Sequence, residues 1–199
     1  MNSTQNEINN NLNVIKSMIE KTKTNTAESG SIFILWGWLV ITASVLTYFF
    51  VCKEWFDRIG YIWFLLMGFG VVATILLVNR HVNRKRVKTY SQLALSNLWF
   101  ACGISFFIIA WIGLPLKVIP FESLYIIMAV IAGVGLFATS GILDWNMLRV
   151  SGTLWWVAAI VMMFIHWHFH TLIFALATIP GYLIPGYALN KKYKKNQNA

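Results

Sequence analysis

The sequence predicts an all-α integral membrane protein with six transmembrane helices. Of its 199 residues, 58% are hydrophobic and only 12% are charged, whereas about a quarter of the residues in an average soluble domain are charged. The charged residues gather in short islands between long apolar stretches. Each of these stretches approaches the ~20 residues that a helix needs to cross a bilayer. Composition and charge placement therefore both predict membrane spans.

The N-terminal segment, residues 1–29, is polar and is predicted to form an amphipathic helix in the cytoplasm. Thr4 and Glu7 have the spacing of a capping box, which starts helices. The apolar residues that follow recur on one helical face: Ile8, Leu12, Ile15 and Ile19. We expect this face to lie on the membrane surface or beneath the helical bundle. The alternative is a partly frayed leader that only adds positive charge.

Residues 30–190 are predicted to form the six-helix transmembrane bundle, because lipid offers no water to satisfy an irregular backbone. The last two spans are joined by a tight turn, and a basic tail, residues 191–199, follows them. The expected spans are approximately 31–51, 60–78, 98–116, 121–143, 150–167 and 171–189.

The placement of lysine and arginine predicts the orientation of the bundle. Of the 16 such residues, all but Lys53, Arg58 and Lys117 fall on one side of a six-span arrangement. Basic loops stay in the cytoplasm, so we expect both termini inside, in the cytoplasmic (inner) membrane of a bacterium. This placement also accounts for the net charge of +9 without nucleic acid as a partner. Cys52 and Cys102 lie at opposite depths, which predicts two free thiols.

Three weak similarities suggest that the bundle consists of three repeated helical hairpins. A Leu-Trp pair opens every odd span: Leu35-Trp36, Leu98-Trp99 and Leu154-Trp155. Two even spans share a Gly-x-x-Ala-Thr motif, at residues 70–74 and 135–139. An Asn or Asp lies nine residues after a glycine in each even span: Gly70 and Asn79, Gly135 and Asp144, Gly181 and Asn190. Repeats of this kind surround an axis along the membrane normal in some transporters; the alternative is convergent use of small residues for helix packing.

The first candidate site is a histidine cluster at the outer end of the fifth span. On a continuous helix His166 and His170 would share a face, with Met162 one turn earlier on the same side. Histidine and methionine together suit copper, and a histidine pair suits zinc. The predicted metal ligands are His166, His168, His170, Met162 and Glu122. The alternative is an interfacial belt, because histidine and aromatic rings gather where a membrane meets water.

The second candidate site is a tandem Ile-Pro-Gly-Tyr motif in the sixth span. Each proline removes a backbone donor and kinks the helix, and broken helices at membrane depth often line binding cavities. We therefore expect a pathway or cavity lined by this span and by the small-residue faces of the even helices. Its predicted lining is Pro180, Gly181, Tyr182, Pro185, Gly186, Thr74 and Thr139. A kink that only improves helix packing is the alternative.

The third candidate site is a basic run that follows the second span. Positive charge beside a span attracts anionic lipid headgroups by about 1 kcal/mol per residue. A cytoplasmic protein partner is a further hypothesis for this surface. The run comprises Arg80, Arg84, Lys85, Arg86 and Lys88.

The sequence argues against several classes of function but does not decide among those that remain. No charged residue lies deep inside any expected span, which argues against ion-coupled transport. The chain contains no phosphate-binding loop, dinucleotide fingerprint or His-Glu-x-x-His motif, so we do not expect an enzyme. Passive transport or permeation of a small solute or ion is the leading hypothesis. The alternatives are a regulatory or assembly protein acting through its basic surface, with self-association of the apolar helices, and a metal-binding protein or enzyme using the histidines.

Overall fold

The computed structural model of the protein describes residues 29–82 and 90–197, and within these ranges the chain is helical with no strands. Six helices are long and apolar enough to cross a membrane. Two of these spans are single α-helices that are joined by a short turn. They are α2 (Ser29–Cys52) and α3 (Phe56–Val82).

The third span is α4 (Tyr90–Phe107), which continues as a π-helix, η1 (Ile108–Gly113). The fourth and fifth spans are α5 (Phe121–Leu143) and α6 (Asn146–Phe164). The sixth span has four parts. It begins with the 3-10 turn η2 (Trp167–Phe169) and α7 (His170–Thr178), and it ends with the π-helix η3 (Ile179–Leu183) and α8 (Ile184–Gln197).

Local sequence explains where α5 begins and ends. Pro120 is extended, with ψ 148°, and proline fixes the geometry that a helix needs just before its first turn. Glu122 adds a negative charge to that first turn, where it meets the positive end of the helix dipole. Asp144 ends the helix with φ 49°, and its N–H donates to the Ser140 carbonyl in the manner of a left-handed cap.

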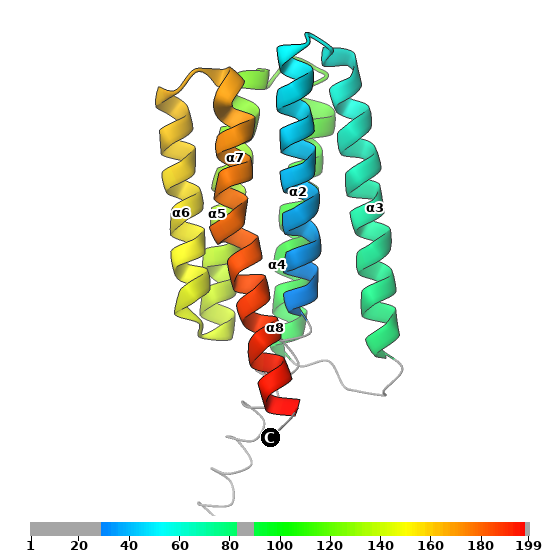
Figure 1. The fold of residues 1–199 in the computed structure, drawn as a ribbon, viewed down its shortest axis with the longest axis vertical. Coiled ribbons are helices and arrows are strands. Elements are labelled where there is room, and N and C mark those ends of the chain that lie inside the picture. The colour runs from blue at the N-terminus through cyan, green and yellow to red at the C-terminus, as the bar shows by residue number, and fades with distance from the viewer. Residues whose placement is uncertain (1–28, 83–89, 198–199) are drawn as a thin grey trace, which may run out of the picture.

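The helices form one bundle in which α2 lies between α3 and α7, with α4 and α5 behind them (Figure 1). We call the end where α2 begins and α8 ends the terminal end, and the opposite end the distal end. Glycines allow the closest approaches: a Cβ at Gly152 of α6 would lie 2.8 Å from the Phe137 nitrogen of α5. A Cβ at Gly186 of α8 would lie 3.1 Å from the Gly30 carbonyl oxygen of α2. Small residues at such contacts are typical of helices that pack inside membranes.

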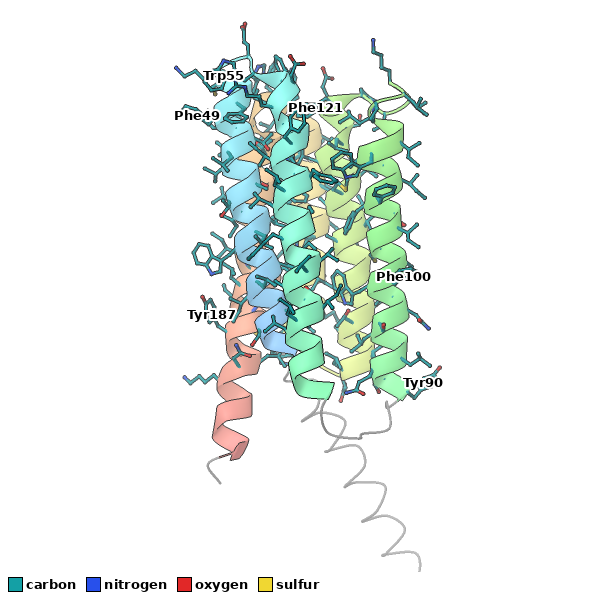
Figure 2. The ribbon with its side chains drawn as sticks, turned by 90° about the vertical axis from the view of Figure 1, so that its right-hand side faces the viewer. Phe49, Trp55, Tyr90, Phe100, Phe121 and Tyr187 are labelled. Carbon is teal, nitrogen blue, oxygen red and sulfur yellow. The ribbon has the colours of Figure 1, made fainter. Side chains whose placement is uncertain are left out.

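The helices α3 and α4 form the periphery of the bundle. Only 11% of the apolar stretch of each is buried, against 33–50% in the other four spans. Large apolar side chains point away from the protein on both helices, as Phe100 of α4 does (Figure 2). The buried core lies mainly among α2, α5, α6 and the sixth span.

The observed bounds differ from the expected spans in several places, including the second span, which runs over Phe56–Val82 rather than 60–78. The fourth span is the same in both, but α4 begins at Tyr90 rather than near 98, because the helix includes polar residues that precede the apolar run. Residues 114–116, expected in the third span, lie in the connection to α5. The fifth span runs over Asn146–Phe164 rather than 150–167, and α8 continues to Gln197 beyond the expected end near 189. The N-terminal amphipathic helix predicted for residues 1–29 falls almost wholly outside the described residues.

Candidate functional site

Each Trp of the three Leu-Trp pairs packs against a glycine of the following span. Gly70 of α3 faces Trp36 of α2: a Cβ added at Gly70 would lie 3.2 Å from that ring. A Cβ at Gly135 of α5 would lie 3.3 Å from the Trp99 ring of α4.

The third such contact joins the fifth and sixth spans. A Cβ at Gly181 of η3 would overlap the indole nitrogen of Trp155 of α6. These are the three glycines, Gly70, Gly135 and Gly181, that occupy matching positions in the proposed hairpin repeat. The matching Asn and Asp residues do not share a role in the same way, because Asp144 caps a helix whereas Asn190 lies within one.

Aromatic rings form a continuous column through the interior, which we call the aromatic column. Near the terminal end, Tyr182 contacts Phe33 at 5.8 Å and Trp99 at 6.1 Å between ring centroids. Tyr182 also contacts Trp155 at 6.0 Å, and Trp155 contacts Phe174 at 4.7 Å.

The column continues to the distal end through α5. Phe174 contacts Tyr125 at 5.4 Å, Tyr125 contacts Phe121 at 6.0 Å, and Phe121 contacts Trp167 at 5.9 Å. Phe121 is labelled near the distal end in Figure 2. A side contact of 6.4 Å joins Tyr125 to Trp63 of α3. Rings of all six spans therefore belong to this column or contact it, between the first turns of α2 and the first turn of α5.

The kink in the sixth span is a π-helix in which the carbonyl of Pro180 accepts a hydrogen bond from a serine of the fifth span. The Ile184 N–H donates to the Ile179 carbonyl, one residue further back than in an α-helix. In this register the Pro180 carbonyl would accept from residue 185, which is a proline and has no N–H. Ser151 of α6 donates to that carbonyl instead, at 2.7 Å. No sequence pattern marks Ser151, because its role depends on the register of η3.

The other residues that were predicted to line a cavity form hydrogen bonds or pack in separate parts of the bundle. Thr74 accepts a hydrogen bond from Trp36 at 3.1 Å and donates to the Gly70 carbonyl. Thr139 is buried and donates to the Gly135 carbonyl. Pro185 is fully buried, and Gly186 packs on α2. Of the predicted lining, Gly181 and Tyr182 lie at the aromatic column.

Polar side chains accompany the column. Trp63 donates to Thr47 of α2 at 2.9 Å, Thr47 donates to the Ala43 carbonyl at 2.7 Å, and the Tyr125 hydroxyl lies beside both side chains. Three buried polar atoms have no hydrogen-bond partner within the described protein: Ser44 Oγ, Trp155 Nε1 and Thr171 Oγ1. Unsatisfied polar atoms are costly in an apolar interior, so these atoms are available to any polar group that enters it.

The histidine cluster does not have the geometry expected of it. α6 ends at Phe164, and Ile165 and His166 are extended, with ψ 147° and 136°. The expectation that His166 and His170 share a helical face is therefore wrong, because the helix stops between them. Met162 is fully buried within α6.

The structure brings together only two of the predicted metal ligands, His166 and His168, whose Nδ1 atoms are 2.8 Å apart. His170 is buried with Nδ1 2.9 Å from the Glu122 carbonyl oxygen and Nε2 2.9 Å from that of Ile165. Carbonyls only accept, so both bonds form together only in the doubly protonated ring. The described part of the chain holds no group of three His, Cys, Asp or Glu residues suited to a metal.

A pocket lies at the distal end, directly beside the last rings of the aromatic column. Its volume is about 350 Å³. We call it the distal pocket; its lining is Phe56, Leu114, Pro120, Phe121, Glu122 and Trp167. Glu122, expected as a metal ligand, instead supplies the one charged side chain of this lining.

The predicted lipid-binding residues Arg84, Lys85, Arg86 and Lys88 lie outside the described residues, and Arg80 is described only as part of the α3 backbone. Both cysteines are free, as expected, with Cys52 exposed and Cys102 buried. No family model, curated protein or solved structure matches this chain.

Proposed function

We propose that the protein crosses a membrane six times, with both termini in the cytoplasm, and lets a small solute pass along the aromatic column. The continuous line of ring contacts carries this proposal. It runs from the terminal end to the distal pocket, and rings of all six spans belong to it or contact it. A pathway through a bundle has to lie between several helices. The aromatic column does so, and it ends at the open distal pocket.

The sixth span supplies the means of opening the column. Tyr182 is part of η3, between two prolines and beside Gly181. Because π-helices and prolines lack some of the regular hydrogen bonds, they are places where helices bend. Movement of this segment would carry Tyr182 away from Phe33, Trp99 and Trp155. The closed column then represents one of two states of a passive pathway.

Two further observations support the proposal. The unpartnered polar atoms of Ser44, Trp155 and Thr171 would offer hydrogen bonds to a solute in the interior. The three Trp–Gly contacts favour a construction from three repeated hairpins, because one packing element recurs in each hairpin. Hairpins related by a pseudo-threefold axis would place a pathway on that axis.

Flux into proteoliposomes tests the proposal. A panel of small neutral solutes and monovalent cations is offered to the purified protein, and uptake is compared with that of protein-free vesicles. We expect uptake of at least one solute, reduced by joint replacement Pro180→Ala and Pro185→Ala, because a regular helix would hold Tyr182 in place. Pro115→Ala, in the connection before α5, is the matched control. Uptake equal to that of empty vesicles for every solute would contradict the proposal.

A second function, assembly with other membrane proteins, is favoured by the exposure of α3 and α4. A Cβ at Gly68 of α3 or at Gly103 of α4 would have no other described part of the chain within 4 Å, and open glycines allow another helix to approach closely. We expect Gly68→Leu with Gly103→Leu to abolish association without unfolding the protein. Gly141→Leu is the control, because Gly141 of α5 is equally open. Energy transfer between labelled copies in liposomes, and recovery of a partner by purification, distinguish self-association from a different partner.

A further inference from the structure

We infer that the distal pocket binds an alkylammonium cation, and that this is the chemical class of the solute. The inference rests on the proposed function only where it calls this cation the transported solute. Binding in the pocket can be tested independently of transport. Three observations support it: the rings of the pocket, its charge and the positions of Arg58 and Lys53 at the same end.

The walls of the pocket are suited to an organic cation. Phe56, Phe121 and Trp167 come from three different elements, and the rings of Phe121 and Trp167 meet edge to face at 88°. Two rings at a right angle present one face and one edge to a shared space, and the negative face of an aromatic ring attracts cations within about 6 Å. Leu114 and Pro120 complete an apolar lining, which suits the methyl or methylene groups beside an ammonium nitrogen.

The lining of the pocket carries one negative charge, and no lysine or arginine of the described ranges forms an ion pair with it. Glu122 is the only ionisable residue of the lining. It is exposed, and within the described ranges its carboxylate makes no ion pair with a lysine or arginine. Its position in the first turn of α5 stabilises that helix, but the backbone of Glu122, not the carboxylate, contacts His170. The carboxylate therefore remains available to a ligand.

Basic side chains of the protein already use aromatic rings at this end. The Arg58 guanidinium lies 4.9 Å from the Trp55 ring centroid, and the Lys53 ammonium lies 6.0 Å from that of Phe49. Phe49 and Trp55 are both at the distal end (Figure 2). These contacts hold Arg58 and Lys53 on other rings, so they do not occupy the rings of the pocket.

An alkylammonium group could come from a soluble amine or from a lipid headgroup, since the distal end is expected at the membrane surface. The first experiment titrates detergent-solubilised protein with choline and with its neutral carbon analogue, 3,3-dimethyl-1-butanol, by saturation-transfer NMR. We expect choline to bind at least about fivefold more tightly, because a cation on exposed rings gains about 1 kcal/mol. Equal binding of the two compounds, or no binding of choline, would overturn the inference without any mutation.

Variants then locate the site. We expect Glu122→Gln and Trp167→Leu each to weaken choline binding by about fivefold, and Glu54→Gln to leave it unchanged. Glu54 is a carboxylate of the α2–α3 turn that does not line the pocket. If Glu54→Gln weakens binding as much as Glu122→Gln does, acidic side chains outside the pocket attract the cation equally well and the pocket assignment is wrong.

The source of the cation is tested in nanodiscs. Competition with choline by phosphatidylethanolamine, but not by phosphatidylglycerol, would assign the pocket to a lipid headgroup. Choline binding that is equal in both lipids would assign it to a soluble amine. The result also separates the two proposals: choline binding without flux refutes the permeation pathway alone, whereas flux of neutral solutes without choline binding refutes this inference alone.

Discussion

The hydrogen bond from Ser151 to the Pro180 carbonyl gives the most specific prediction about stability. Replacing Ser151 with alanine removes the side-chain donor to that carbonyl, and residue 185, a proline, has no N–H to take its place. A buried carbonyl left without a donor costs about 1–3 kcal/mol in water-soluble proteins. Interhelical hydrogen bonds measured within membranes average about 0.6 kcal/mol, with a maximum near 1.7. We therefore expect Ser151→Ala to lower the free energy of unfolding by about 1 kcal/mol.

Reversible unfolding in mixed micelles measures this change, with Thr153→Ala as the control. Thr153 is on the same helix but is exposed, and its hydroxyl donates to the Arg149 carbonyl of its own helix. We expect the control to change stability by less than about 0.5 kcal/mol, as surface substitutions usually do.

A double-mutant cycle tests whether the lost hydrogen bond to the Pro180 carbonyl causes this decrease in stability. In a Pro185→Ala background residue 185 regains an N–H that reaches the Pro180 carbonyl, so Ser151→Ala should lower stability less than it does in the native chain. An unchanged effect of Ser151→Ala in that background would refute the reasoning.

Three further predictions concern packing and the distal turn. Gly181→Ala should lower the free energy of unfolding by about 1–3 kcal/mol, because the added methyl group collides with Trp155. Gly103→Ala is the control: its surroundings are open, so it should leave the free energy of unfolding unchanged or raise it. Equal effects of the two variants in thermal unfolding would contradict the Trp–Gly contact. His170→Leu should lower stability by about 1–3 kcal/mol because the carbonyls of Glu122 and Ile165 lose their donor, while His168→Leu, on the same turn, should have little effect in the same assay. Elemental analysis of tag-free protein should find zinc and copper well below one ion per chain, since the described residues bring together only His166 and His168; a stoichiometric metal that is lost on His166→Ala would support the metal hypothesis instead.

The six long apolar helices could be predicted from the sequence because hydropathy is a local property of composition. Residues 121–143 illustrate this, since a proline before the run and Asp144 after it mark both ends of α5. A tight turn after the fifth span was expected, but the end of the helix at Phe164 could not be predicted, because no proline or glycine lies between Phe164 and His170. There the helix is ended by the packing of the sixth span, which places His170 between two carbonyls. The expectation that His166 and His170 share a helical face is wrong for this reason.

The exposure of α3 and α4 also could not be predicted from composition. Lipid is as apolar as a protein core, so an apolar residue carries no signal for which of the two it faces. The glycines of the three hairpins could be found as a pattern, whereas their contacts with Trp36, Trp99 and Trp155 required the fold. Ser151 gave no signal, because a small hydroxyl in an apolar helix is common and only the π register of η3 makes it necessary.

Access of water-soluble reagents to the aromatic column tests the central claim most directly. In a chain with Cys52→Ser and Cys102→Ala, single cysteines replace Phe174, a ring of the column, and Leu176, which lies on the same helix with 65% of its surface exposed. Each variant is treated in proteoliposomes with a small charged thiol reagent. A pathway along the column predicts that Phe174→Cys reacts faster than Leu176→Cys and that a transported solute slows the reaction. Equal reaction at both positions, or reaction at Leu176→Cys alone, would contradict the pathway.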